Sequence, residues 1–346
     1  PVYTENTRGF RFLTSSVNSS GSIWKNWQEE ANNTGTNFLI DNNDPSPGYG
    51  THITGNINGE NGFDASISGN PSMFTFDNTY TGNQSNAWNS IINTNNRKLN
   101  AGEAYRIFIR GDRGYNLSSN PADGPNSDVI LRATGSLVTD DITFDLSQQA
   151  GYYSFIGNPY QANVNINDIT GTNYNTNFYW VWDPNMSQRG AYVAVDLPTG
   201  TPAGTSDANE FVQPGQSFFV QTANNGAANL TFSESAKDVT ALPTDVFNDN
   251  DQTNINLLLY TEQALNNNDS EADALGINLS PNGNNAVDQM DAGKFGNPDE
   301  NLARLNNGEY ISIENRAMPV DGESLEIFTN GYSATNYTFI ANASNL

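Results

Sequence analysis

The side chains best suited to catalysis are few in this sequence, and they lack the partners that catalysis requires. His52, the only histidine, lies in GYGTHITG (residues 48–55). A serine nucleophile of the α/β-hydrolase kind needs a G-x-S-x-G turn, which is absent. A zinc site needs several nitrogen or sulfur ligands, and the chain contains no cysteine. We therefore interpret His52 as a loop residue and expect no catalytic residue and no zinc site.

Carboxylates are abundant, with 38 Asp and Glu residues, but this abundance makes their spacing uninformative. A glycosidase needs only two carboxylates, and almost any spacing occurs by chance here. Three oxygen-rich turns, at residues 41–45, 248–251 and 288–293, lack the spacing of an EF-hand loop. Asx turns explain the same residues without a metal. We expect no enzyme and no cofactor, with weak calcium binding left open.

Aromatic side chains offer a different chemistry, because their large apolar rings can stack on sugars. Trp24 and Trp27 occur in IWKNWQEE (residues 23–30), and Tyr49 and His52 follow in the same part of the chain. We predict that the two tryptophans form an exposed patch and that all four residues contact a partner or a glycan. The only helical hint in the sequence, KNWQEEANN (residues 25–33), overlaps this segment.

The string RIFIRGDRG (residues 106–114) gathers Arg106, Arg110 and Arg113 in an otherwise acidic chain. It contains Arg-Gly-Asp at residues 110–112, but a tripeptide occurs readily by chance and is weak evidence for receptor binding. We expect instead that these arginines form ion pairs that tie a turn to an acidic neighbour.

Composition and charge narrow the class of protein. The net charge is −24, which disfavours nucleic acid and anionic membranes as partners. Hydrophobic residues make up 36% and aromatic residues 11%, with many polar turn formers, a profile typical of strand-rich proteins. The absence of cysteine excludes disulfides, and no apolar run is long enough for a membrane helix. No signal segment follows Pro1, so we expect that any signal peptide is already missing.

The chain that carries these residues contains an internal repeat, in which three short strings recur in the same order. Each string alternates aromatic and other residues with the period of a strand. The matched strings are GFRFLTSSV and YYSFIGNPY (9–17 and 152–160), MFTFDN and YWVWDP (73–78 and 179–184), and AGEAYRI and PGQSFFV (101–107 and 214–220). Leu13 thereby matches Ile156, and Tyr105 matches Phe218. Because Trp180 and Trp182 match phenylalanines, we expect them in a core.

This repeat predicts an all-β fold of tandem β-sandwich or jelly-roll-like modules. We place related modules at residues 1–135 and 136–240, a linker at 241–254 and a third sandwich at 255–346. The first module holds a long insertion at about 18–60, which is where we expect function, because binding residues concentrate on loops. The strand candidates of the third are residues 255–262, 275–280, 309–314, 324–330 and 336–342.

Several strings resemble the C-terminal regions of large secreted proteins of Bacteroidota, especially flavobacteria. The resemblance is carried first by RGFRFLTSSV, GYGTHITG, GFDASISGNPSMFTFDN and AGEAYRIFIRGDRG, and then by YYSFIGNPYQANV, YWVWDPN and VQPGQSFFVQT. The segment DAGKFGNPDENLARLNNGEYISIENRAMP resembles the one before the C-terminal sorting domain recognised by the type IX secretion system. The resemblance covers nearly the whole chain; after ASNL the family would continue into the sorting domain, which we expect to be missing, cleaved or outside this sequence.

The resemblance implies export by the type IX route and a location outside the cell or on its outer surface. We therefore expect a non-enzymatic adhesin or adhesin-anchoring scaffold, of a kind connected in some cases with gliding motility. Its partners would be outer-membrane secretion or motility components, or another surface protein. The alternative is the carbohydrate-binding or stalk region of a secreted polysaccharide-degrading enzyme, which would contact glycans.

Overall fold

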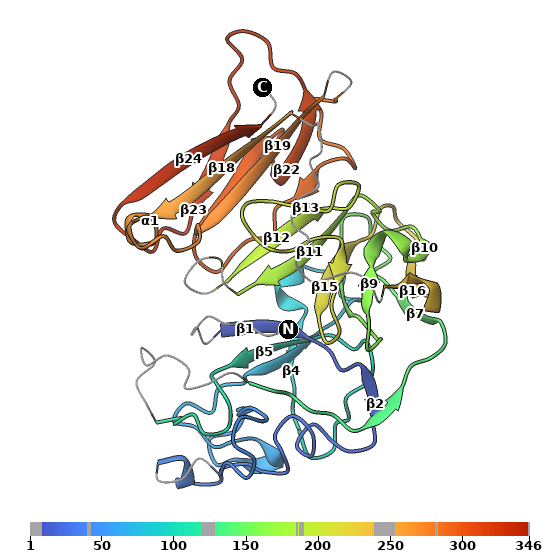
Figure 1. Cartoon of the computed structure of the whole chain (residues 1–346), viewed down its shortest axis with the longest axis vertical. Coiled ribbons are helices and arrows are strands. Elements are labelled where there is room, and N and C mark those ends of the chain that lie inside the picture. The colour runs from blue at the N-terminus through green and yellow to red at the C-terminus, as the bar shows by residue number, and fades with distance from the viewer. Residues whose placement is uncertain are drawn as a thin grey trace. The chain divides into compact units, whose positions relative to one another are not determined.

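A computed structural model describes residues 9–39, 43–118, 129–184, 186, 190–238, 253–280 and 283–344 (Figure 1). Most of the predicted linker, residues 241–252, lies outside this part of the chain, as do residues 41–42 and 248–251 of the oxygen-rich turns. The chain divides into two compact units. Unit 1 comprises Pro1–Tyr174 and Val212–Val239, and unit 2 comprises Asn175–Phe211 and Thr240–Leu346. The module boundaries predicted at residues 135 and 240 are defined by repeated sequence strings and not by compactness. They therefore stay a prediction.

Strands dominate both units, which confirms the predicted all-β fold class. In the described part of the chain, the only α-helix is α1 (Glu262–Asn267). The helical hint at residues 25–33 is wrong, because this segment forms turns in which Glu29 and Glu30 have positive φ angles of 55° and 56°. Short 3₁₀ turns occur at Asn37–Leu39, Glu60–Gly62, Gln84–Asn86, Ile166–Asp168 and Glu234–Ala236.

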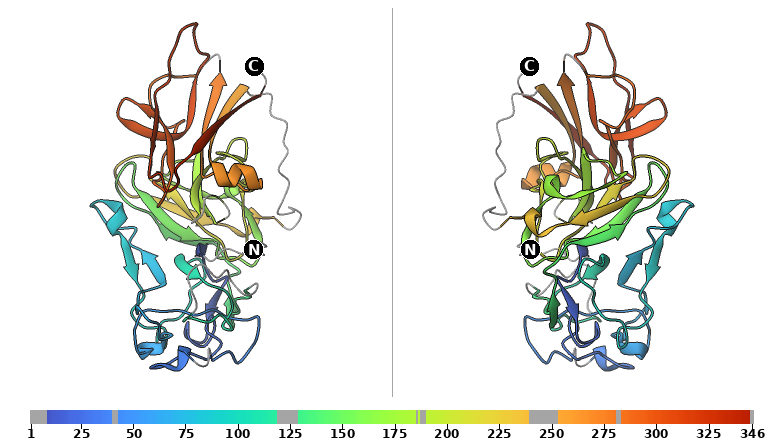
Figure 2. Two further views of the ribbon diagram at one scale, coloured as in Figure 1. Left: turned by 90° about the vertical axis from the view of Figure 1, so that its left-hand side faces the viewer. Right: turned by 90° about the vertical axis from the view of Figure 1, so that its right-hand side faces the viewer.

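Unit 1 contains a four-stranded antiparallel sheet with long connections between its strands (Figure 2). Its order is β1-β5-β3-β4, formed by β1 (Gly9–Leu13), β5 (Tyr105–Ile109), β3 (Met73–Phe76) and β4 (Trp88–Ser90). One face of the sheet and the loops of the predicted insertion share a single core. Its buried members are Ile23, Trp27, Ile53, Phe63, Met73, Ile91, Leu99, Tyr105 and Ile107.

The other strands of unit 1 are also paired. β8 (Tyr153–Gly157) pairs with β15 (Ser217–Gln221), and β2 (Val17–Ser19) pairs with β6 (Gly135–Leu137). A three-stranded sheet has the order β10-β16-β7, from β10 (Thr170–Thr172), β16 (Asn229–Phe232) and β7 (Ile142–Asp145). β9 (Asn163–Asn165) pairs with β17 (Lys237–Asp238), and the chain passes between the two units at β14 (Phe211–Val212).

The repeated strings of unit 1 pair in the same register. In β1 and β5, Leu13 lies opposite Tyr105, and in β8 and β15, Ile156 lies opposite Phe218. These are the positions that the sequence comparison matches. Two copies of one sequence pattern would produce this register, because side-chain alternation with period two fixes which residues face each other.

The two strand pairs of unit 1 are joined by an aromatic cluster. The Phe155 and Phe219 rings are stacked at 4.6 Å, and Phe12 contacts both edge-on at 4.7 and 5.7 Å. Phe76 and Trp88 add further edge-on contacts to Phe219, at 5.1 and 6.0 Å. Each such contact contributes about 0.5–1.5 kcal/mol beyond the burial of the rings. The predicted strand faces therefore meet each other rather than solvent.

A glycine permits the close approach of the repeated strings. The Gly157 N–H donates to the Gly102 carbonyl at 2.9 Å, and the Thr14 N–H donates to the Gly215 carbonyl at 2.9 Å. A Cβ on Gly157 would lie 2.4 Å from the Thr14 Cβ, closer than two carbon atoms can approach. Gly157 in the Gly-Asn-Pro turn is therefore a packing requirement, as expected where two backbones come together.

Two side-chain amides cover the free edge of β8. The Phe155 N–H donates to Asn78 Oδ1 at 2.7 Å, and the Asn78 Nδ2 group donates back to the Phe155 carbonyl at 3.3 Å. Gln84 makes the equivalent pair with Tyr153, with both distances 2.8 Å. An exposed edge of unpaired N–H and C=O groups invites aggregation, and these amides satisfy it.

Unit 2 contains two sheet systems. β11 (Phe178–Asp183), β12 (Ala191–Asp196) and β13 (Thr201–Pro202) are antiparallel neighbours, and Trp180 and Trp182 on β11 are buried, as predicted. The larger sheet has the order β23-β21-β22-β19-β18-β24, with β20 also paired to β22. Its strands are β18 (Thr253–Thr261), β19 (Asp273–Ser280), β20 (Ala292–Gly293), β21 (Asn301–Asn306), β22 (Glu309–Ala317), β23 (Ile327–Asn330) and β24 (Tyr337–Ser344).

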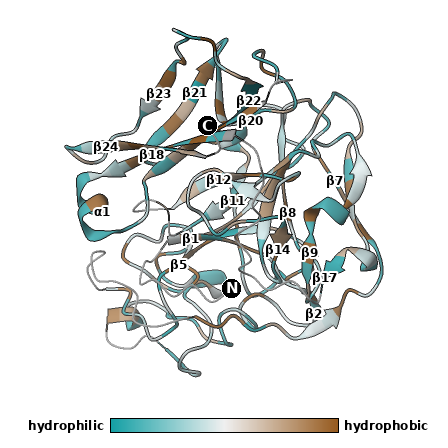
Figure 3. Ribbon diagram, turned by 45° about the horizontal axis from the view of Figure 1, so that its top comes forward, coloured by the Kyte–Doolittle hydropathy of each residue, from teal (hydrophilic) through white to brown (hydrophobic). Residues whose placement is uncertain are grey.

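The larger sheet confirms the five strand candidates of the C-terminal region, while β20 and β21 were missed. Hydrophobic and hydrophilic residues both occur along its strands, as the colours of β21 show in Figure 3. One face carries an apolar core of Leu259, Leu275, Ile277, Leu279 and Leu302. Adjacent β19 and β22 are parallel, whereas the other paired strands of this sheet are antiparallel.

Candidate functional site

Two of the four residues predicted to contact a partner or glycan are buried. Trp27 is 3% exposed and packs edge-on against Tyr105 with ring centres 5.7 Å apart. His52 is 0% exposed. The prediction of surface contacts is therefore wrong for these two residues, because the insertion folds over its own core instead of lying outside it. The predicted patch of two exposed tryptophans does not form.

The other two predicted residues keep part of their surface. Trp24 is half-buried, and its indole N–H donates to Asn32 Oδ1 at 3.1 Å. Tyr49 is half-buried, and the Arg132 guanidinium lies over its ring, 4.0 Å from the centre. Their proposed contact with a partner or glycan stays a prediction.

The loops of the insertion are held by a buried ion pair of two residues outside it, and the sequence did not reveal which acidic residue takes part. Arg113 holds Asp64 with two parallel hydrogen bonds, Nη2 to Oδ1 at 2.8 Å and Nη1 to Oδ2 at 3.1 Å. Both side chains are 0% exposed. Such a bidentate pair is stronger and more directional than a single contact. The prediction that an arginine of RIFIRGDRG would tie a turn to an acidic neighbour is thus confirmed for Arg113.

Further donors surround the Asp64 carboxylate. It accepts the backbone N–H groups of Asn33 at 2.9 Å and Ile53 at 3.0 Å, and the Gln28 amide at 3.1 Å. His52 Nδ1 lies 3.3 Å from Asp64 Oδ1. Burial alone would raise the pKa of Asp64, but the charges and hydrogen bonds of His52 and Arg113 hold it well below its usual range. A buried carboxylate with so many donors stays ionised.

The His52 ring is oriented by its second nitrogen. Nε2 lies 3.0 Å from the Tyr115 carbonyl oxygen, so Nε2 carries a hydrogen, because a carbonyl can only accept. His52 thus links the segment after Arg113 to Asp64. The interpretation of His52 as a plain loop residue missed this role, since both of its contacts come from distant parts of the chain.

The Arg-Gly-Asp tripeptide at residues 110–112 belongs to the same buried region. Asp112 is 6% exposed, and its carboxylate accepts the N–H groups of Gly48 and Gly114, both at 2.9 Å. The Asp112 carboxylate is therefore engaged inside unit 1 and is not presented to a receptor.

The loops around the Asp64 cluster are joined by backbone hydrogen bonds. Ala65 donates to Asn33 at 2.9 Å, Gly35 donates to Asn58 at 2.9 Å, and Thr94 donates to Asn61 at 2.9 Å. The loop surface formed by residues 33–39, 56–69 and 92–95 carries exposed aliphatic side chains. They are Leu39, Ile57, Ile67 and Ile92, which are 51%, 55%, 67% and 81% exposed. We name this region the insertion loop surface.

The oxygen-rich turn at residues 288–293 is explained by its own hydrogen bonds. Asp288 accepts the Met290 N–H at 2.8 Å, and Asp291 accepts the N–H groups of Asp288 at 3.0 Å and Asn315 at 2.8 Å. Across the described residues, no three acidic or histidine side chains are grouped to hold a metal ion. Nor does the described chain contain a helix that is long and apolar enough to cross a membrane.

Comparison with known proteins yields no relative. No protein-family model, curated protein or solved structure matches the chain. The function proposed below is therefore supported by the protein's own structure and by the sequence resemblance described above.

Proposed function

We propose that this chain belongs to a non-enzymatic surface protein of Bacteroidota, exported by the type IX secretion system, that acts as an adhesin or adhesin-anchoring scaffold. The observation that carries the proposal is the buried cluster of Asp64, Arg113 and His52. It fixes long loops in one arrangement, which is what a contact surface on a rigid scaffold needs. His52, the only histidine, and its carboxylate neighbour Asp64 are both part of this buried cluster.

The secretion route and location rest on the sequence resemblance. Three of its quoted strings supply the cluster, since His52, Asp64 and Arg113 come from GYGTHITG, GFDASISGNPSMFTFDN and AGEAYRIFIRGDRG. The shared strings thus supply the buried cluster around which the insertion loop surface is folded, and residues 62–69 of that surface belong to one of them. A partner on the outer membrane or another surface protein would contact this surface through its exposed aliphatic side chains.

The test is capture of proteins from flavobacterial outer-membrane extracts by the immobilised chain. Ile67→Asp places a charge on the insertion loop surface and should abolish capture of the specific partner. Val320→Asp is the matched control, because Val320 is a similarly exposed aliphatic residue (72% against 67%) in unit 2. Equal capture by both variants would contradict the role of the loop surface, and release of reducing sugars from a polysaccharide would contradict the non-enzymatic assignment.

The alternative is a carbohydrate-binding or stalk region of a secreted polysaccharide-degrading enzyme. Such a region would need contacts with a glycan other than the four predicted from the sequence. Trp27 cannot stack on a sugar, because its ring is in the core of unit 1. On the insertion, Trp24 and Tyr49 remain. Glycan binding that is lost in Trp24→Ala would favour this alternative.

A further inference from the structure

The larger sheet of unit 2 has a polar face opposite its apolar core. On β18, Asn254 and Asn256 alternate with Ile255, so both amides lie on the same face. Across the strand pair, Asn254 is opposite Asn278 and Asn256 is opposite Gly276. A row of asparagines on a sheet face is unusual, because asparagine is depleted in strands.

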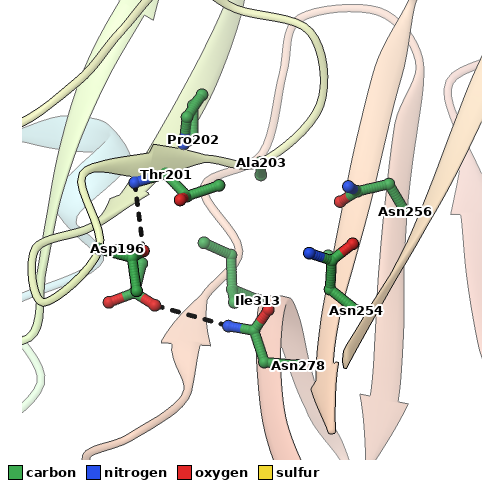
Figure 4. Close-up of a pocket in the computed structure, with 10 residues that line it drawn as sticks. Asp196, Thr201, Pro202, Ala203, Asn254, Asn256, Asn278 and Ile313 are labelled. Carbon is green, nitrogen blue, oxygen red and sulfur yellow. Dashed lines mark hydrogen bonds between the residues drawn. The ribbon is translucent and has the colours of Figure 1, made fainter. Parts of the chain in front are cut away.

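The hairpin of β12 and β13 lies beside these asparagines and closes a cleft (Figure 4). The cleft is open to solvent, and the space enclosed among its lining residues is about 30 Å³, so a ligand larger than a few water molecules would lie partly outside it. Asn254 and Asn256 belong to β18, and Asn278 belongs to the adjacent β19. Ile313, on β22, flanks the other side of β19, and Asp196 comes from β12. Thr199, Thr201, Pro202, Ala203 and Gly276 complete the lining.

Two acceptor groups in this cleft lack strong donors. Asp196 is 7% exposed, and its carboxylate has a long contact of 3.5 Å to Asn278 Nδ2 and a hydrogen bond from Thr199. No described lysine, arginine or histidine forms an ion pair with Asp196. Asn254 Oδ1 is buried and has no hydrogen-bond partner among the described residues. Buried acceptors without donors are costly, and such groups often mark a ligand position.

The lining residues define the chemistry of the ligand. Asp196 and Asn254 Oδ1 require donors, whereas the amide groups of the asparagines and the Thr201 hydroxyl can also donate. The hydroxyl groups of a ligand can donate to the acceptors of the cleft and accept from its donors. An ammonium ion can only donate, and a carboxylate can only accept. The apolar carbons of Pro202 and Ile313 can cover the C–H face of a ring. We infer that this cleft binds a neutral saccharide at its open side, with a hydroxyl group of one sugar unit reaching between Asp196 and Asn254.

The floor of the cleft provides a direct test. A Cβ on Gly276 would lie 3.5 Å from Asn256 Oδ1 and 3.6 Å from the nearest Ile313 carbon, which are ordinary contacts. Gly276→Ala therefore occupies space in the cleft without a clash in the sheet. Asn254→Ala removes the buried acceptor. Asn342→Ala is the matched control, because Asn342 is exposed on β24 opposite Asn256 and does not line the cleft.

The experiment is saturation-transfer NMR and calorimetry with the whole chain. The probes are glucose, mannose, galactose and N-acetylglucosamine, with glucuronate and methylammonium as charged comparisons. We expect at least one neutral sugar to bind, with affinity reduced about tenfold or more in Gly276→Ala and Asn254→Ala, as the loss of one or two hydrogen bonds predicts. Asn342→Ala should bind like the unmodified chain.

The inference is independent of the proposed function, since the adhesin partner would contact unit 1. It is overturned if none of the neutral sugars binds, if methylammonium binds in their place, or if the cleft variants bind sugar as well as Asn342→Ala does. Circular dichroism of each variant distinguishes loss of the site from loss of the fold. If Gly276→Ala misfolds, Asn254→Ala alone decides the outcome.

Discussion

Replacing Arg113 by methionine tests the proposal that a buried ion pair fixes the insertion loops. The change keeps much of the side-chain volume but leaves the Asp64 carboxylate buried without its bidentate partner. Removing one partner of a buried pair costs about 3–5 kcal/mol, because the remaining charge is uncompensated. That is a large share of the roughly 5–15 kcal/mol that stabilises a whole domain. We therefore expect the loops around Asp64 to open locally.

The assay is hydrogen exchange of the whole chain, followed by mass spectrometry of peptides that contain Ile53 and Asn33. The N–H groups of these residues donate to Asp64, so their exchange reports on the cluster. A loss of about 4 kcal/mol corresponds to roughly thousandfold faster exchange, since every 1.4 kcal/mol is tenfold. Arg132→Met is the control, because Arg132 pairs with Glu29 at the surface and its side chain is 51% exposed.

The same cluster predicts a dependence on pH. The pKa of Asp64 is lowered in the folded protein, so the unfolded chain binds this proton first as the pH falls. The stability that Asp64 contributes is therefore present above about pH 4, its unfolded pKa, and is lost progressively as the pH falls toward its folded value. Arg113→Met should lose less stability on acidification. Exchange in Arg113→Met no faster than in Arg132→Met at neutral pH would refute the reasoning.

Three further predictions concern stability and packing. Burial raises the pKa of Asp196 to about 6, so its contribution to stability is full below about pH 4 and is lost as the pH rises through 6. Asp196→Asn should therefore raise the free energy of unfolding by at most about 3 kcal/mol at pH 7.5, measured as a higher melting temperature, and change it little at pH 4. Phe219→Ala removes the centre of the aromatic cluster and should cost about 3–5 kcal/mol in urea unfolding, whereas an effect under 1 kcal/mol would show that the cluster is not a core. Gly157→Ala should destabilise unit 1 by about 1–3 kcal/mol in the same assay, because its Cβ meets Thr14, and a neutral effect would contradict the close approach.

Local sequence pattern was sufficient for the aromatic strands of the repeat, although it did not predict which of them pair. Alternation of aromatic and other residues predicted β1, β5, β8 and β15, and the matched positions Leu13 with Ile156 and Tyr105 with Phe218 have the same register in both pairs. The burial of Trp180 followed from the same match. These features are local, because side-chain alternation and turn residues act over a few positions.

The tertiary structure alone decided which polar residues are buried and what they contact. Asp64 is 49 residues from Arg113 in the sequence, and nothing in its neighbours distinguishes it from the other 37 acidic residues. Trp27 looked like a surface residue because its partner Tyr105 lies far along the chain. The cleft beside Asn254 depends on the register of β18 with β19 and on a separate hairpin. The environment of a polar group is set by whatever the fold places around it, and a single sequence does not record those long-range neighbours.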